Sequence, residues 1–429
     1  MILYYLLLLA LPFHADPRVG VVLLRTSFLV VTPVKILGVL AVAAAVLSSK
    51  RRDAGSRVGR SLIVPFALFV TIPPLATLAS GQPTPSDTIS QMISGSLLFA
   101  ATQMSVTTEQ RLRQVVRILV LAFAFGSLWT YKEHFIDHAA QSFGLEGESN
   151  YEGLMLLPAI ALSFWVASFE VTAMRRRVGV GCALLLIGAL VLTESRGGIL
   201  AGLVMALMAI LRGRHKLPRL LLLAAAAVLI LTLGPANLLT RFSRIKLIGA
   251  PQNGDEQSTR LHVELLKAGF SMIEDHPLLG VGLERFKPLA AIYNPEIVRI
   301  SGRSYVAHDT FLQIGAECGV PVLLLFVWMV LFARRNFRRL QRSEDPALAA
   351  LSIAMEAALV GVSFAALSIS VELLPFWLLI FLSISMRRVA AAEARVPVPS
   401  RSPLQDRNFA AILRDSRDPS AGTLRIQTQ

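Results

Sequence analysis

The chain has 429 residues, of which 54% are hydrophobic and 16% are charged, and its formal net charge is +14 at pH 7. Apolar runs of roughly 18 or more residues recur from end to end, which excludes a soluble globular protein and indicates an all-α, polytopic integral membrane bundle. The basic residues gather in short connections between these runs, so the positive charge does not indicate nucleic-acid binding. Cys182 and Cys318 lie inside apolar runs, and no zinc-ligand spacing or P-loop occurs; we therefore expect no disulfide, metal or cofactor.

We predict about twelve transmembrane helices. The first apolar run is interpreted as a transmembrane helix and not as a cleaved signal peptide, because it lacks the basic start and the cleavage site of a signal peptide. Their approximate ranges are 1–13, 28–49, 61–79, 88–106, 115–131, 151–171, 178–193, 198–211, 218–234, 309–333, 347–368 and 372–386. Clusters of Lys and Arg follow alternate spans, near residues 50–60, 111–117, 175–177, 212–219, 334–342 and 387–388. By the positive-inside rule that side is cytoplasmic, and so are both termini.

The opposite, periplasmic side carries a short acidic loop at 132–150 and a large loop at 235–308. A helix is predicted in the large loop from about Thr259 to Asp275, because polar and apolar residues alternate there with helical periodicity. The apolar face comprises Leu261, Leu265, Ala268 and Met272, and the polar face comprises Arg260, Glu264, Lys267, Ser271 and Glu274. The turn at 276–282 ends this helix. The composition of residues 389–429 predicts a disordered cytoplasmic tail after a membrane domain at 1–388.

Three basic side chains on the periplasmic side are candidate catalytic residues. Arg196 follows the seventh span, Arg260 lies on the polar face of the loop helix, and His308 precedes the tenth span. A guanidinium group grips phosphate oxygens through its planar fork, and a neutral imidazole can take a proton from a hydroxyl near pH 7. Two arginines and one histidine are therefore suited to a lipid diphosphate leaving group and an attacking alcohol.

Other polar residues are candidates for substrate binding. Asp309, Gln313 and Glu317 share one helical face below His308, and polar groups at membrane depth are expensive unless they line a cavity or meet partners. Further candidates are Ser195, Arg285 and Arg303.

Structural roles for several of these residues remain open alternatives. Arg196 could lie at the membrane interface, and Arg260 could pair with Glu264 on a solvated helix face. His308 could cap a helix, and Glu317 could be a buried carboxylate hydrogen-bonded within the bundle.

Three ordered segments carry a family resemblance: Ser195-Arg196-Gly197-Gly198, the stretch from Arg260 through the turn at 276–282, and His308 through Gly319. Together with the large loop between them, they resemble the O-antigen ligase and polymerase superfamily of bacterial glycosyltransferases, over about 178–333. The resemblance implies a bacterial inner-membrane enzyme with a periplasmic active site. Such an enzyme moves a glycan from undecaprenyl diphosphate to an acceptor hydroxyl without a metal or a nucleotide sugar.

The resemblance also implies residue roles and substrates. Arg196 and Arg260 occupy the positions of the arginines that engage the diphosphate, and His308 occupies that of the essential histidine. The acceptor is lipid A–core in ligases and another lipid-linked glycan repeat in polymerases.

Two departures from the ligase pattern leave both a ligase and a polymerase possible. Asp309 stands where Asn, Ser or Gln is usual, and Val322 stands where Gly, Thr or Tyr is usual. An Asp next to His308 is expected to raise the basicity of the imidazole. A non-enzymatic transporter is a further alternative, although the ionisable groups gather at the outer mouth rather than along a path through the bundle.

Overall fold

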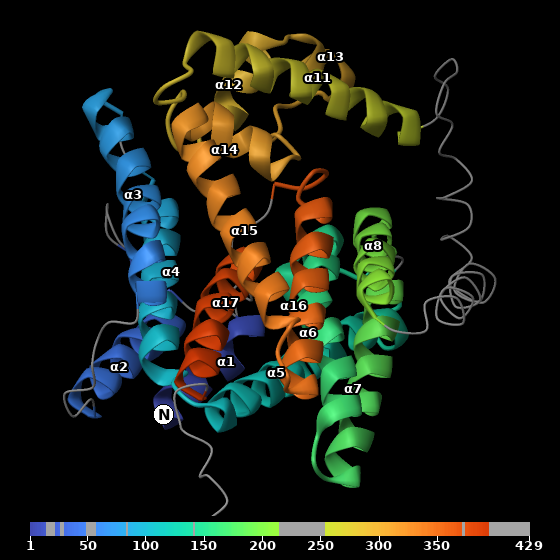
Figure 1. Ribbon diagram of the computed structural model, residues 1–429. Helices are drawn as coiled ribbons and strands as arrows, with labels where there is room; N and C mark the ends of the chain where they lie inside the picture. The colour runs from blue at the N-terminus through green and yellow to red at the C-terminus, as the bar shows by residue number, and fades with distance from the viewer. Residues whose placement is uncertain are drawn as a thin grey trace, which may run out of the picture. The chain divides into compact units, whose positions relative to one another are not determined.

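A computed structural model of the chain describes residues 1–13, 22–25, 30–48, 57–82, 85–139, 142–213, 254–370 and 374–393 (Figure 1). The chain divides into two compact units, Met1–Val389 and Ala390–Gln429. The second unit, and with it the predicted disordered tail, lies almost entirely outside the described residues.

Helices account for nearly all of the regular structure in the described ranges. The first half contains α1 (Ile2–Ala10), η1 (Leu11–Phe13), β1 (Leu24–Arg25), β2 (Val30–Val31), α2 (Pro33–Ser48), α3 (Arg57–Ala79), α4 (Ser86–Ser105), α5 (Glu109–Phe135), η2 (Gly144–Glu146), α6 (Ser149–Phe169), α7 (Ala173–Leu192) and α8 (Arg196–Arg212). The second half contains α11 (Gly254–Asp275), α12 (Phe286–Tyr293), α13 (Glu296–Ser301), α14 (Thr310–Cys318), α15 (Val320–Leu340), α16 (Pro346–Ala365) and α17 (Leu374–Glu393). The two short strands pair antiparallel. The predicted all-α class is confirmed.

Within the described residues, six helices are long and apolar enough to cross a membrane. They are Leu62–Ala79, Glu109–Phe135, Ser149–Phe169, Val320–Leu340, Pro346–Ala365 and Leu374–Ala392. The predicted spans 88–106, 178–193 and 198–211 coincide with α4, α7 and α8, whereas 218–234 falls outside the described residues. The count of about twelve spans and the periplasmic placement of the large loop stay predictions.

The bundle core is built by apolar side chains that meet between helices far apart in the chain. Helix α6 packs against α5, α7, α8 and α16. Between α3, α15 and α17, the ring of Trp377 lies 5.1 Å from that of Phe66 and 6.0 Å from that of Phe326, both edge-on. Such edge-to-face contacts add to the gain from burying the rings.

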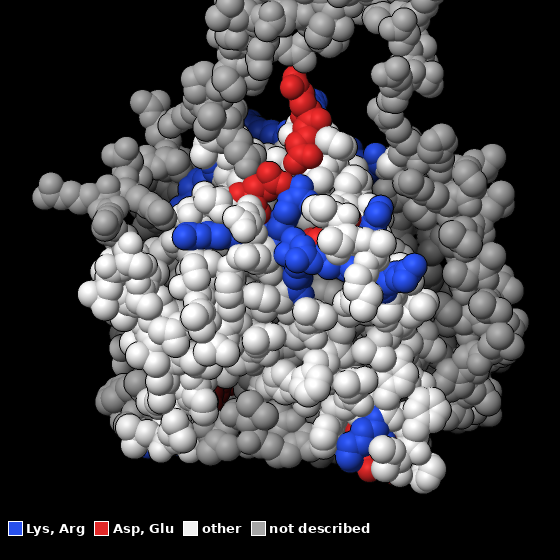
Figure 2. Space-filling view, turned by 90° about the horizontal axis from the view of Figure 1, so that it is seen from below, with Lys and Arg blue, Asp and Glu red and all other residues white. Residues whose placement is uncertain are grey.

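At one end of the bundle, the carboxylate of Glu356 on α16 joins the C-terminal parts of two other helices, α8 and α15. Although Glu356 is fully buried, it is paired with Arg212 at 3.3 Å, Arg334 at 3.0 Å and Arg338 at 2.9 Å. Figure 2, seen from below, shows basic side chains gathered near the middle of the view. A buried charge needs such partners, because removing them leaves an uncompensated ion. Some residues of the predicted basic clusters, namely Arg212, Arg334 and Arg338, therefore also form ion pairs inside the protein.

The tenth predicted span, 309–333, is wrong as a single helix: it is broken at Gly319 into α14 and α15. Gly319 has φ +85, and a Cβ atom there would lie 2.3 Å from the carbonyl oxygen of Leu278. The break occurs because the turn after α11 docks at this point. The amide of Val281 donates to the carbonyl oxygen of Ala316 at 2.8 Å, and Val320 donates to Pro277 at 2.8 Å. The turn thus satisfies backbone groups that a helix end leaves without partners.

The loop helix is confirmed and is longer than predicted, since α11 runs from Gly254 to Asp275. Helix α11 packs against α12, α13 and α14 (Figure 1), and its apolar face is the side that is buried. Leu265, Ala268 and Met272 are fully buried there, together with Phe286 and Ala290.

Gly280→Ala should separate the turn from α14, because the added Cβ atom would lie 2.3 Å from the carbonyl carbon of Glu317. The matched control is Gly302→Ala, which has a similar φ of +73 but open space around the added atom. We expect the control to lose about 1 kcal/mol from left-handed backbone strain and Gly280→Ala to lose roughly 2 kcal/mol more from overpacking. Thermal unfolding midpoints in detergent measure both; equal losses would contradict this docking.

Candidate active site

The backbone around His308 is anchored to the turn at residues 366–370, between α16 and α17. The amide of Thr310 donates to the carbonyl oxygen of Ala366 at 2.8 Å, and its hydroxyl donates to the carbonyl oxygen of Ile369 at 2.7 Å. Thr310 is 3% exposed. His308, two residues earlier, adopts a left-handed backbone with φ +51. A non-glycine residue in this conformation persists only where its surroundings hold it, and the Thr310 contacts supply that restraint.

The His308 side chain lies between two other rings. Its centroid is 5.1 Å from that of His262 on α11 and 5.9 Å from that of Tyr305. Burial, and after it the nearby His262, lowers the pKa of His308 to about 4. The imidazole is therefore uncharged near pH 7.

The expected increase in the basicity of His308 is contradicted. Asp309 is the N-cap of α14, and its carboxylate accepts a hydrogen bond from the amide of Leu312 at 2.9 Å. Capping is the usual role of Asp at this position. The pKa of His308 is lowered instead, because desolvation of the charged form outweighs any gain from the neighbouring carboxylate.

Arg260 and Arg303 each lie two residues before a ring of this cluster, Arg260 before His262 and Arg303 before Tyr305. Arg260 is exposed on α11, two residues before His262. Its charge contributes to lowering the pKa of Glu264, although hydrogen bonds from Lys267 and Asn294 contribute more. The guanidinium of Arg303 lies 4.7 Å above the Tyr305 ring and its Nε donates to the Tyr305 hydroxyl at 2.8 Å. Arg303 therefore contacts Tyr305, whose ring in turn lies near His308.

The third candidate, Arg196, is the half-buried first residue of α8. Ser195 caps this helix, since its hydroxyl accepts from the amide of Gly198 at 3.0 Å and donates to Asn150 Oδ1 at 2.7 Å. Ser195 is thus a structural cap.

The first turn of α8 contacts the same 366–370 turn that holds Thr310. A Cβ atom on Gly197 would lie 3.2 Å from the hydroxyl oxygen of Ser368. The Tyr151 hydroxyl, on α6, donates to the carbonyl oxygen of Ser370. One short turn therefore joins the Arg196 segment to the His308 segment.

The remaining candidates have partners elsewhere. Glu317 is 7% exposed and accepts a hydrogen bond from the amide of Phe286 at 3.0 Å and one from Gln313 Nε2 at 3.4 Å. Arg285 donates to Gln82 after α3. These contacts favour structural roles for Gln313, Glu317 and Arg285, with the carboxylate of Glu317 holding the start of α12.

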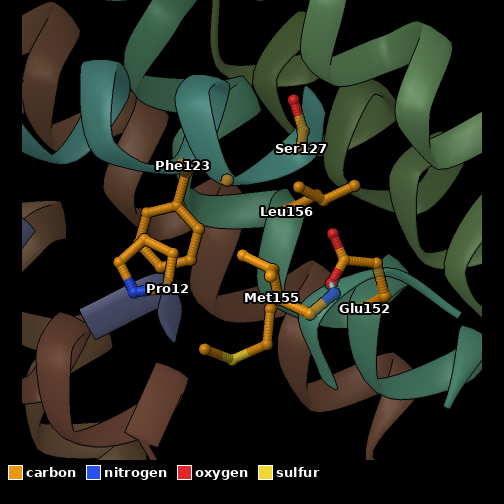
Figure 3. Close-up of a pocket in the computed structure, with 8 residues that line it drawn as sticks. Pro12, Phe123, Ser127, Glu152, Met155 and Leu156 are labelled. Atoms are coloured by element: carbon orange, nitrogen blue, oxygen red, sulfur yellow. Dashed lines mark hydrogen bonds between the residues drawn. The ribbon is translucent and has the colours of Figure 1, made fainter. Parts of the chain in front are cut away.

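A separate small cavity lies between η1, α5, η2 and α6 (Figure 3). It is lined by Pro12, Phe123, Gly126, Ser127, Leu145, Glu152, Met155 and Leu156. Glu152 accepts hydrogen bonds from the Thr130 hydroxyl at 3.3 Å and the Leu145 amide at 3.2 Å. None of the predicted site residues lines it.

His262 and Tyr305 are the two residues of the ring cluster that the sequence did not predict. The signal available for His262 was its place two residues from Arg260, at the border between the polar and apolar faces of the loop helix.

The six candidate spans and the helical architecture define a polytopic helical membrane protein. Residues 181–327 match the model of the O-antigen ligase family. This match confirms, over that segment, the resemblance to the O-antigen ligase and polymerase superfamily. The matched family is one of membrane glycosyltransferase-like enzymes of surface polysaccharide biogenesis that use lipid-linked glycans. No curated protein matches the chain.

Thr310→Val should weaken the anchoring of the His308 segment, because valine has nearly the same shape but leaves the carbonyl oxygen of Ile369 without this donor. We expect a loss of about 1–2 kcal/mol in stability. Thr310→Ser retains the hydroxyl and is the matched control, so its thermal unfolding midpoint in detergent should stay closer to that of the wild type. A serine variant as unstable as the valine variant would indicate that methyl packing, and not the hydrogen bond, matters here.

Proposed function

We propose that this protein is a bacterial inner-membrane glycosyltransferase that moves a glycan from undecaprenyl diphosphate to an acceptor hydroxyl at the periplasmic face, as O-antigen ligases do. The family match over residues 181–327 supports the class of reaction. The observation that carries the proposal for this chain is the 366–370 turn, to which both the Arg196 helix and the His308 segment are attached.

The donor diphosphate is bound in this proposal by Arg196 and Arg260. Arg196 stands at the N-terminus of α8, where the helix dipole also favours an anion. Arg260 is exposed on α11, two residues from the ring that contacts His308. Fixed positive charge that meets the developing charge of the diphosphate lowers the barrier to its departure. For that reason the reaction needs neither a metal nor a separate general acid.

The acceptor hydroxyl is positioned by His308. Its uncharged imidazole accepts the hydrogen bond of the hydroxyl, whose oxygen attacks the anomeric carbon. The bond from that carbon to the diphosphate breaks, its electron pair leaves with the diphosphate, and the hydroxyl proton passes to the imidazole. Direct displacement inverts the anomeric centre. Since the pKa of His308 is lowered to about 4, the proton moves late, and orientation of the hydroxyl is the larger part of the role.

A repeat-unit polymerase is the second candidate, favoured by Asp309 and Val322 where the ligase pattern has other residues. The chemistry is the same, and only the acceptor differs. The glycans of a deletion strain separate the two: loss of a ligase leaves long lipid-linked polymer and bare lipid A–core, whereas loss of a polymerase leaves single capped repeats.

His308→Ala should reduce glycan transfer by about 100-fold or more, because it removes the group that orients the acceptor and takes its proton. The assay uses proteoliposomes containing undecaprenyl diphosphate-linked glycan, with either lipid A–core or a second lipid-linked repeat as acceptor.

The control for this substitution is His134→Ala, which removes a histidine that packs on Phe135 at the end of α5. It should transfer glycan at nearly the wild-type rate. Near-normal transfer by His308→Ala would refute the role of this imidazole.

A further inference from the structure

His262 is held against His308 by the docking of α11. The two ring centroids are 5.1 Å apart and the ring planes are inclined by 35°. Both side chains are half-buried. Packing of one imidazole on another restricts the rotation of both rings, so the contact defines how the His308 ring lies.

The position of His262 follows from the packing of its own helix. One turn further along α11, Leu265 is fully buried, and so is Ala268. Gly269 then brings α11 close to α14, since a Cβ atom there would lie 2.5 Å from Leu312 Cδ2. The distance between the two helices is therefore fixed by close packing, and the two imidazoles are brought together by the fold.

We infer that His262 is a positioning residue for the glycan transfer proposed above, whose imidazole packs on that of His308 and keeps the His308 ring turned toward the acceptor. This inference rests on the proposed function.

Among the charged groups around His308, His262 is the one that disfavours protonation of the His308 imidazole. On α11, the carboxylate of Glu264 is hydrogen-bonded to Lys267 at 2.8 Å and to Asn294 at 2.8 Å, and Arg260 adds positive charge. On the chain segment of His308 itself, the carboxylate of Asp309 accepts a hydrogen bond from the Leu312 amide and also interacts electrostatically with His262. That segment also carries Arg303 and Tyr305, which bond to each other. The turn at 366–370 carries no titratable side chain. The lowered pKa of His308 agrees with this arrangement, burial being the larger cause and His262 the second.

The test compares two substitutions that keep bulk at this position and differ in charge. His262→Phe keeps an aromatic ring against His308 but removes the titratable group. The electrostatic contribution by which His262 lowers the pKa of His308 is then missing, so the pKa of His308 rises and the acid limb of kcat moves to higher pH. His262→Lys keeps a positive charge at every working pH, so its acid limb should stay at or below that of the wild type.

The measurement is kcat and KM for the lipid-linked donor between pH 4 and 8, in the proteoliposome assay described above. We expect KM for the donor to change by less than about twofold, because the diphosphate is held by other groups. Lys267→Gln removes a basic side chain from the same helix and is the control; its pH profile should match the wild type. If His262→Phe does not insert stably, His262→Gln provides the same comparison without the ring.

The outcomes separate this inference from the proposed function. If His262→Phe and His262→Lys lose kcat equally and keep the acid limb of the wild type, the role of His262 is packing alone and the inference is wrong. If the wild-type protein transfers glycan to neither acceptor, the proposed function is wrong whatever the variants do. An inactive His308→Ala variant beside unaffected His262 variants would leave the function standing and overturn the inference.

Discussion

The described part of the candidate site depends on hydrogen bonds between two helix ends. Thr310 begins α14, where a helix has amides without internal partners, and Ala366 follows α16, where a helix has carbonyls without partners. The amide of Thr310 donates to the carbonyl oxygen of Ala366 at 2.8 Å, so each end satisfies the other. In an apolar surrounding such groups are costly when left unpaired. The requirement to pair them places His308 beside the turn that also contacts α8.

A second constraint joins the large loop to the bundle. Because Gly280 and Gly319 both adopt left-handed conformations, the turn after α11 can lie directly on the break between α14 and α15. Its amides reach the last carbonyls of α14, and the carboxylate of Glu317 reaches forward to the amide of Phe286. The C-terminal end of the loop helix is therefore fastened to the end of α14. This is why His262 meets His308 although 46 positions separate them in the sequence (308 minus 262).

Most of the fold was predictable from the sequence, because apolar runs and the 3.6-residue period of α11 are local signals. The break at Gly319 was not, since Val320 and the residues after it continue the apolar run and hide the interruption. In the site, His308 and its neighbourhood followed from ordered motifs, but the use of Asp309 as a cap and of Glu317 as a backbone acceptor depends on partners distant in sequence. His262 lacked a pattern of its own, because one imidazole at the edge of an amphipathic face becomes informative only when the helix is docked. The number of spans and the orientation in the membrane stay predictions.

The central claim is that the start of α8 lies against the turn at 366–370, so that Arg196 and His308 belong to one site. It is tested most directly by a disulfide between Gly197→Cys and Ser368→Cys, since a Cβ atom on Gly197 would lie 3.2 Å from the Ser368 hydroxyl oxygen, a separation suited to the bond. The native thiols of Cys182 and Cys318 are first replaced by alanine, so that only the introduced pair can react. Under mild oxidation in membranes, both introduced thiols should become protected from alkylation, and a reductant should restore them. Thiols that stay fully alkylable under oxidation would show that the two segments are apart, and the proposed site would have no structural basis.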